Sequence, residues 1–180
     1  PSAQPLQSSS NLDNDGDVDF ICGNWGLNSI FKASKEKPIT LYRNDFDANG
    51  STESLVTYFH NDIETTFASK DDLVKQLPFL NKEYLSYTKF AKASIDELFG
   101  NKNLKNSGKK YVYELQSCVF LNDGKANFSK IALPKIAQSS QINAIAVDDL
   151  NNDTFSDLIL AGNNHQISTQ LGRLDSCHGL

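Results

Sequence analysis

Short apolar runs bounded by Asn, Asp and Gly recur along most of the chain, a pattern typical of β-strands joined by tight turns. Asp123-Gly124 lies between two such runs and predicts a hairpin turn. The first ten residues are rich in Ser, Pro and Gln, so we expect a flexible lead over 1–10. The predicted strands cover residues 17–24, 39–44, 53–60, 64–69, 111–121, 127–133, 142–148 and 156–162.

The hydrophobic period becomes helical over residues 70–100. Ser69 is the predicted N-cap of a first helix. A second helix is predicted to follow Ser86 and to stop at Gly100, because glycine favours the backbone conformation that ends helices. We therefore expect a helical insertion, within residues 62–114, inside an otherwise all-β fold.

Three acidic segments of nine residues share the form D/N-x-D/N-x-D/N-G-x-x-D/E. They are loop 1 (NLDNDGDVD, 11–19), loop 2 (DFDANGSTE, 45–53) and loop 3 (DLNNDTFSD, 149–157). Thr154 occupies the sixth position of loop 3, where the other two loops have Gly16 and Gly50. An apolar, strand-like run follows each loop, so the repeated unit is an acidic loop leading into a strand.

This spacing suits a hard cation such as Ca²⁺, which takes about six to eight oxygen ligands in proteins. Side chains at positions 1, 3 and 5 wrap around one point, glycine at position 6 allows the sharp turn, position 7 offers a backbone carbonyl, and the acid at position 9 closes the site. The predicted metal ligands are Asn11, Asp13, Asp15, Asp17 and Asp19 in loop 1, Asp45, Asp47, Asn49, Ser51 and Glu53 in loop 2, and Asp149, Asn151, Asp153, Phe155 and Asp157 in loop 3.

Two other interpretations of the loops have to be weighed. Asp, Asn and Gly also mark turns that hold no metal. An EF-hand needs flanking helices and a bidentate Glu at position 12, where this chain has Cys22, Val56 and Leu160. These apolar residues exclude the EF-hand.

With these loops and runs such as FICGN and LILAGN, the chain resembles the FG-GAP/VCBS repeats of integrin α-chains and of bacterial surface and secreted proteins. GNWGLNS, LYRNDFDANGS, FLNDGKANF and DDLNNDTFSDLILAGN resemble the large bacterial members, including those with an ASPIC/UnbV-type tail. The resemblance covers about residues 11–165. It implies β-propeller blades with Ca²⁺ in hairpin loops. It also implies adhesion or recognition at an extracellular, periplasmic or cell-surface location, without catalytic residues.

The chain is too short for a closed ring of blades, so we expect a propeller fragment of about three blades over residues 11–180, which can self-associate through its open sheet edges. The ligand would be another protein or a glycan, for which Trp25 is the candidate aromatic contact; a Trp in the core is the other interpretation of this residue. The alternative function is a calcium-dependent hydrolase or lyase. Its candidate residues are His165, Arg173, Asp175 and His178, which a solvated C-terminal loop also explains.

Charge and cysteine content narrow the function classes further. The chain has 22 acidic and 17 basic residues, a net charge of −5, which disfavours a nucleic-acid partner. It has no apolar run long enough to span a membrane. Cys22, Cys118 and Cys177 are odd in number and widely spaced, so they predict neither a disulfide framework nor a zinc site.

Overall fold

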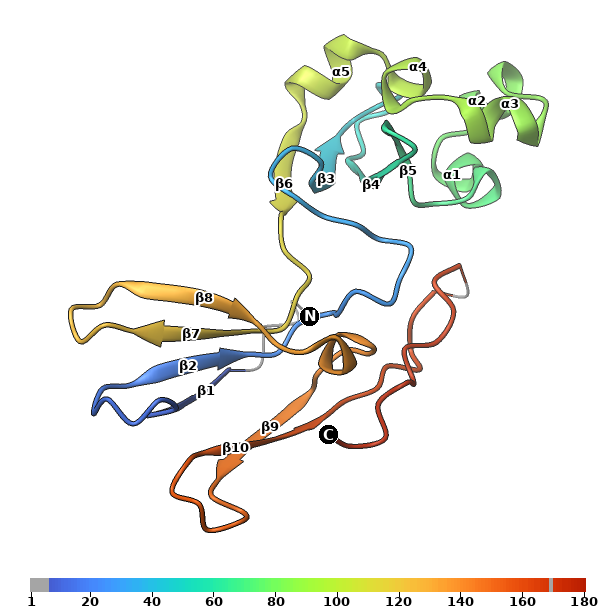
Figure 1. Cartoon of the computed structure of the whole chain (residues 1–180). Helices are drawn as coiled ribbons and strands as arrows, with labels where there is room; N and C mark the ends of the chain where they lie inside the picture. Colours follow the sequence, from blue (N-terminus) through green and yellow to red (C-terminus); the bar gives the residue numbers. More distant parts are fainter. Residues whose placement is uncertain (1–6, 169) are drawn as a thin grey trace. The chain divides into compact units, whose positions relative to one another are not determined.

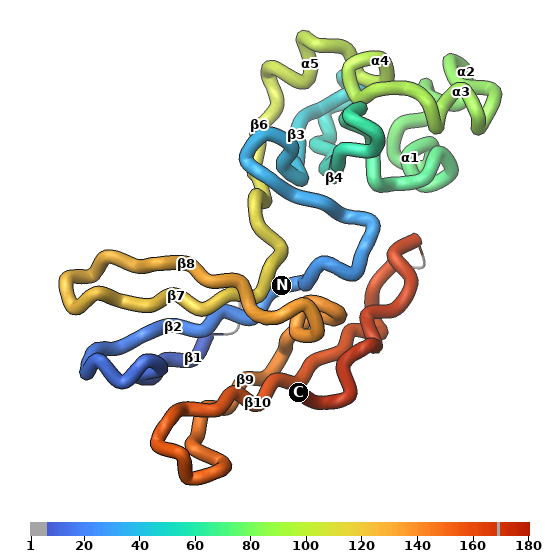
Figure 2. Tube along the Cα trace, in the orientation of Figure 1, coloured from blue at the N-terminus to red at the C-terminus, as the bar shows by residue number. Residues whose placement is uncertain are grey.

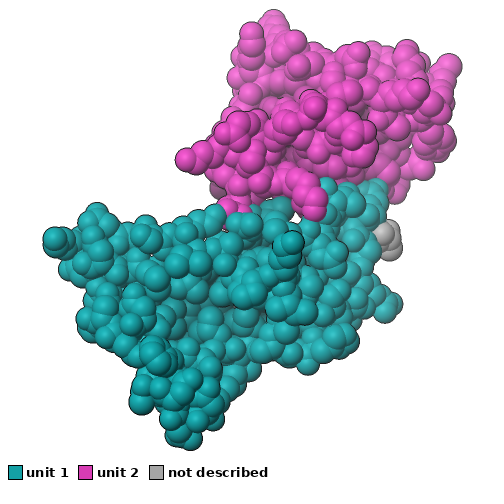
Figure 3. Space-filling model, viewed as in Figure 1, with its two compact units in different colours: residues 1–30, 115–180 teal, residues 31–114 magenta. Residues whose placement is uncertain are grey.

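The computed structural model describes residues 7–168 and 170–180, and the chain divides into two compact units (Figures 1 and 3). Unit 1 contains residues 1–30 and 115–180, and unit 2 contains residues 31–114. The fold is mainly β, and its sheets are antiparallel and open. The prediction of a β-rich fold with a helical segment is therefore confirmed at this coarse level.

The described strands are β1 (Gln7–Ser10), β2 (Asp19–Cys22), β3 (Ile39–Asn44), β4 (Glu53–His60), β5 (Ile63–Thr66), β6 (Gly108–Val112), β7 (Cys118–Asn122), β8 (Phe128–Ala132), β9 (Ala144–Asp148) and β10 (Asp157–Ala161). The helices are α1 (Lys70–Gln76), α2 (Phe79–Glu83), α3 (Tyr87–Lys92), α4 (Ile95–Phe99), α5 (Asn101–Asn106) and a 3₁₀ turn, η1 (Lys135–Gln138).

Unit 1 contains a four-stranded sheet in the order β1-β2-β7-β8 and a separate hairpin, β9–β10 (Figure 2). Its largest cluster of buried apolar side chains joins the hairpin to the segment around η1. The cluster comprises Leu133, Ala137, Ile142 and Leu160, with Val119, Ile145 and Leu158 packed against it. Because Val119 belongs to β7, this cluster also connects the hairpin to the sheet.

Unit 2 contains the sheet β5-β4-β3-β6, and its helices pack against one face of that sheet. Tyr42 and Leu55 alternate with more exposed neighbours on β3 and β4, as expected for strands with one buried face. From the helices, Leu73, Leu80 and Leu98 enter the same core. Since these side chains are almost fully buried, the helices belong to the core of unit 2.

The strand predicted over residues 111–121 is not continuous. The run 111–121 divides between β6, which pairs with β3, and β7, which pairs with β2. At Ser117, just before β7, the side chain of Gln138 accepts from the backbone N–H and donates to the carbonyl oxygen. The same carbonyl oxygen also accepts from the backbone N–H of Leu133 at 3.0 Å, so both Gln138 and Leu133 hold the chain where β7 begins.

The helical segment follows its predicted limits only in part. Ser69 caps α1 by accepting a hydrogen bond from the backbone N–H of Asp72, as predicted. The second predicted helix is divided into α3 and α4, because Ser94 and Glu97 form a capping box that begins a new helix. Gly100 ends α4 with a positive φ of 73°.

Two predicted boundaries can be compared with the described residues. Residues 7–10 of the expected flexible lead form β1, which pairs along its whole length with β2, and residues 1–6 lie outside the described residues. The compact unit that interrupts unit 1 covers residues 31–114. It thus contains β3 and β4 in addition to the predicted insertion, because both strands share a sheet with β5 and β6.

Candidate metal sites

Each acidic loop joins two neighbouring antiparallel strands, and the three hairpins have the same register. Loop 1 connects β1 to β2, loop 2 connects β3 to β4, and loop 3 connects β9 to β10. The residue before each loop is paired with the acid at position 9: Ser10 with Asp19, Asn44 with Glu53, and Asp148 with Asp157. These flanking strands agree with the exclusion of an EF-hand, which needs helices there.

The acid at position 9 makes the same hydrogen bond in all three loops. Its carboxylate accepts from the backbone N–H at position 2: from Leu12 at 2.7 Å, from Phe46 at 3.0 Å and from Leu150 at 3.1 Å. This contact closes the loop across its base. A carboxylate oxygen has two lone pairs, so each of these oxygens can still accept a second partner.

Hydrogen bonds between residues two apart in the sequence also repeat inside the loops. The side-chain oxygen at position 5 accepts from the backbone N–H at position 7, in the pairs Asp15 with Asp17, Asn49 with Ser51, and Asp153 with Phe155. The oxygen at position 3 accepts in the same way from the N–H at position 5. These are the local turns that Asp and Asn favour, and they hold the loops whether or not a metal binds.

The backbone path repeats as well. Position 4 has a positive φ in every loop, with values of 63°, 59° and 62° at Asn14, Ala48 and Asn152. Position 6 has φ values of 99° and 88° at Gly16 and Gly50 and of 74° at Thr154. A β-branched residue is strained in this left-handed region. Thr154 therefore follows the same path as the glycines at a cost in conformational energy.

Loop 2 brings three carboxylates together. One oxygen each from Asp45, Asp47 and Glu53 lies within 4.8 Å of the other two. Two oxygens bound to the same Ca²⁺ at about 2.4 Å can be at most about 4.8 Å apart, so this set meets a necessary condition for sharing one ion. Glu53 is 6% exposed, whereas the two aspartates are half-buried. Over residues 7–168 and 170–180, no other group of three acidic, His or Cys side chains converges this closely.

Loop 1 holds its acids less closely together but contains two buried oxygens without a donor. Oδ1 of Asn11 and Oδ1 of Asp17 are inaccessible to solvent and accept no hydrogen bond. Burial, together with the nearby carboxylates of Asp15, Asp19 and Asp13, raises the pKa of Asp17. Asp19 is fully buried, and besides its bond to Leu12 it accepts from the backbone N–H of Asn122 at 2.9 Å.

The acid at position 9 of loop 3, Asp157, is half-buried, whereas Asp19 and Glu53 are buried. Asp149, through its two oxygens, accepts from the backbone N–H groups of Asp153 and Thr154 at 3.1 and 2.8 Å. Loop 3 also contacts loop 1, because the Asn14 side chain donates to the carbonyl oxygen of Thr154 at 3.0 Å. Loops 1 and 3 thus lie at the same end of unit 1, and loop 2 belongs to unit 2.

The turn between β7 and β8 is the hairpin predicted at Asp123-Gly124. The Asp123 carboxylate accepts from the backbone N–H groups of Lys125 and Asn127 at 2.9 and 3.2 Å, and from the Asn127 side chain at 2.9 Å. Asp123 therefore holds the turn without any convergence of carboxylates. It provides a reference for what an acidic turn looks like without a candidate metal site.

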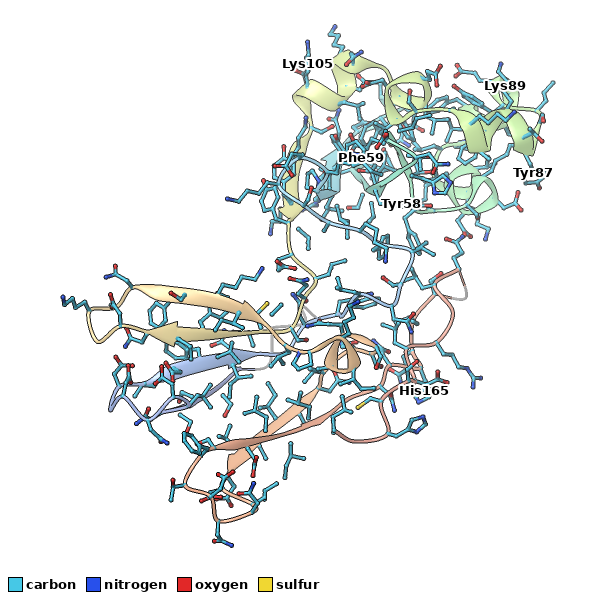
Figure 4. All side chains as sticks on the ribbon, viewed as in Figure 1. Tyr58, Phe59, Tyr87, Lys89, Lys105 and His165 are labelled. Carbon is cyan, nitrogen blue, oxygen red and sulfur yellow. The ribbon has the colours of Figure 1, made fainter. Side chains whose placement is uncertain are left out.

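The residues considered for other functions all belong to unit 1. His165, Arg173, Asp175 and His178 are all exposed on the segment after β10, where Figure 4 labels His165. Trp25 is half-buried, and its indole Nε1 is buried without an acceptor. The enzyme and glycan interpretations of these residues stay predictions.

Comparison with known proteins returned no match: no family model, no curated protein and no solved structure matches this chain. No helix within the described part of the chain has the length and apolar character needed to cross a membrane.

Proposed function

We propose that this chain is a non-catalytic recognition or adhesion module whose hairpins are stabilised by Ca²⁺. It belongs to an incomplete β-propeller of the FG-GAP/VCBS kind and acts at an extracellular, periplasmic or cell-surface location. Its ligand is a protein or a glycan. The observation that carries the proposal is the convergence of Asp45, Asp47 and Glu53 at the base of loop 2.

The chemistry of loop 2 favours a hard divalent cation. Its ligand set consists of carboxylate oxygens, and the segment 45–53 contains no basic residue that could neutralise them. Three like charges so close together repel one another, and a bound Ca²⁺ would offset that repulsion while linking the two ends of the loop. The amide oxygen of Asn49 and the carbonyl oxygen of Ser51 are the remaining proposed ligands.

The equivalent paths of loops 1 and 3 support a repeated device. The two buried oxygens of Asn11 and Asp17, which accept no hydrogen bond, favour a cation in loop 1 as well. A cation in each loop would then link the two strands of the hairpin at their turn. In this role calcium stabilises structure and activates no water.

Thermal unfolding with and without calcium tests the proposal. If one site has a dissociation constant near 10⁻⁴ M, about 1 mM Ca²⁺ adds about 1.4 kcal/mol to the free energy of unfolding. We expect the melting temperature in calcium to exceed that in excess chelator by about 3–6 °C for loop 2 alone, and by more if loops 1 and 3 also bind.

Glu53→Gln keeps an acceptor for the Phe46 N–H and removes one of the three charges, so it should abolish the contribution of loop 2 to this difference. Glu83→Gln makes the same chemical change at an exposed position on α2 and should leave the difference intact. Identical melting curves of the wild-type protein in calcium and in chelator would refute the proposal.

A further inference from the structure

Two cysteines that lie far apart in the sequence occupy opposite positions on neighbouring strands of unit 1. Cys22 is the last residue of β2, Cys118 is the first residue of β7, and the two are direct partners in the antiparallel pairing. Direct partners have Cα atoms about 4.5–5.5 Å apart and side chains on the same face of the sheet. A disulfide needs Cα atoms about 4.4–6.8 Å apart, so the backbone already meets this requirement.

One thiol of the pair is buried and the other is partly accessible to solvent. Cys118 is 1% exposed, Cys22 is partly exposed, and both are thiols in this structure. The Cys118 thiol donates to the carbonyl oxygen of Gln116 at 3.4 Å. Burial raises the pKa of the Cys22 thiol, so little thiolate forms at neutral pH and spontaneous oxidation is slow.

Because of the chain topology, a disulfide between these cysteines should have a large effect on stability. The chain between the two cysteines includes the whole of unit 2, since unit 1 is interrupted over residues 31–114. A cross-link that closes a loop of about 100 residues restricts the unfolded chain strongly. It would join covalently the two strands on either side of the interruption.

We propose that Cys22 and Cys118 are a modification site at which a disulfide forms when the protein meets a small-molecule disulfide such as glutathione disulfide. The partly exposed Cys22 thiolate attacks one sulfur of glutathione disulfide, which breaks its S–S bond and releases one glutathione. The Cys118 thiolate then attacks Sγ of Cys22 and releases the second glutathione. Two protein thiols are oxidised and one glutathione disulfide is reduced to two thiols.

The third cysteine provides an internal control. Cys177 lies in the segment after β10, where its sulfur is 3.9 Å from the carbonyl oxygen of Leu160. It is not a strand partner of either of the other two cysteines. The pairing is therefore expected to be specific, with Cys177 remaining reactive toward alkylating reagents.

The test incubates the folded chain with glutathione disulfide at mildly alkaline pH, which compensates for the raised thiol pKa. After alkylation and digestion, we expect one linked peptide pair joining Cys22 to Cys118, with a mass lower by two hydrogens, and alkylated Cys177. The oxidised protein should melt about 5–15 °C above the dithiothreitol-treated protein. Cys177→Ala should retain this difference.

Cys22→Ala and Cys118→Ala should each abolish both the linked peptide and the shift in melting temperature. Cys22→Ala is the decisive variant if the loss of the buried thiol at position 118 prevents folding. The proposal is overturned if Cys22 and Cys118 remain fully alkylatable or carry only glutathione, if the linked peptides contain Cys177, or if the shift persists in Cys22→Ala.

Discussion

Loops 2 and 3 have the same length, register and pattern of hydrogen bonds, yet only loop 2 gathers three carboxylates within 4.8 Å. They differ at five positions among the proposed ligands and the turn residue at position 6. Loop 2 has Asp, Asn, Gly, Ser and Glu at positions 3, 5, 6, 7 and 9, whereas loop 3 has Asn, Asp, Thr, Phe and Asp. Since the backbone path is shared, the difference in convergence must come from the side chains.

The comparison separates two roles of the acidic residues. The hydrogen bonds to backbone N–H groups occur in both loops, so they define the turn. Convergence on one point also requires side chains that are long enough to meet. The side chain of Glu53 is one methylene longer than that of Asp157 and extends further over the loop. Turn formation and metal binding are therefore distinct properties of the same nine residues, and they can be varied independently.

The largest effect should follow from removal of the acid at position 9. Glu53→Ala leaves the buried N–H of Phe46 without an acceptor and should cost about 2–3 kcal/mol even in chelator. Asp157→Ala should cost about 1 kcal/mol or less, because Leu150 is exposed and water can replace the carboxylate. Urea unfolding in excess chelator measures both. Equal losses would show that burial does not distinguish the two loops.

The convergence of loop 2 should be transferable to loop 3. Asn151→Asp combined with Asp157→Glu reproduces the carboxylates of loop 2 at positions 3 and 9. In a Glu53→Gln background, where loop 2 is inactive, we expect the pair of substitutions to increase calcium stabilisation by about 1.4 kcal/mol. The measurement is the calcium-dependent shift of the urea midpoint. No gain would mean that side-chain reach is not what separates the loops.

The residue at position 6 provides a test that does not involve metal. Thr154 adopts a φ of 74°, so Thr154→Gly should relieve strain and stabilise the protein by about 1 kcal/mol in chelator. Gly50, with a φ of 88°, should show the opposite response, and Gly50→Ala should destabilise by a similar amount. No atom lies within 4 Å of the added methyl group at Gly50, so the loss would come from the backbone alone. Urea midpoints that move in the same direction would contradict this explanation.

The smallest effect concerns Asp123, which holds a turn without a candidate metal site. The hydrogen bond from the Asn127 side chain, followed by that from the Lys125 N–H, lowers the pKa of Asp123. A lowered pKa contributes stability above the unfolded value of about 3.9 and loses it as pH falls through the folded value. Asp123→Asn should therefore reduce the difference in urea midpoint between about pH 6 and pH 3, without any change in the calcium response. A reduced calcium response would show that this turn also binds metal.

The local patterns of the sequence were sufficient for most of the strands. β3 and β4 have the limits predicted for 39–44 and 53–60, because alternating runs there end at the acidic turn of loop 2. The division of 111–121 was not predicted, because it reflects a change of pairing partner as the chain passes from unit 2 to unit 1. β6 pairs with β3 and β7 pairs with β2, and this pairing is not encoded in the local pattern.

For the candidate sites, the sequence predicted the position and form of the loops but not which loop gathers its acids. All three segments fit one motif, and their shared path agrees with that motif. Glu53 and Asp157 differ in side-chain length, which the sequence shows, and in burial at the base of the hairpin, which it does not. The facing positions of Cys22 and Cys118 depend on strand pairing across unit 2, which no local pattern encodes.

The contact between Gly26 and Leu115 bears on how insertions in this chain are tolerated. The N–H of Gly26 donates to the carbonyl oxygen of Leu115 at 2.8 Å, so the two segments of unit 1 that flank unit 2 lie side by side. Unit 2 is therefore inserted at a point where the two flanking segments of unit 1 are hydrogen-bonded to each other. For unit 1, a change in the length of unit 2 is a change in the length of one connection. The entropic cost of closing a connection grows slowly with its length.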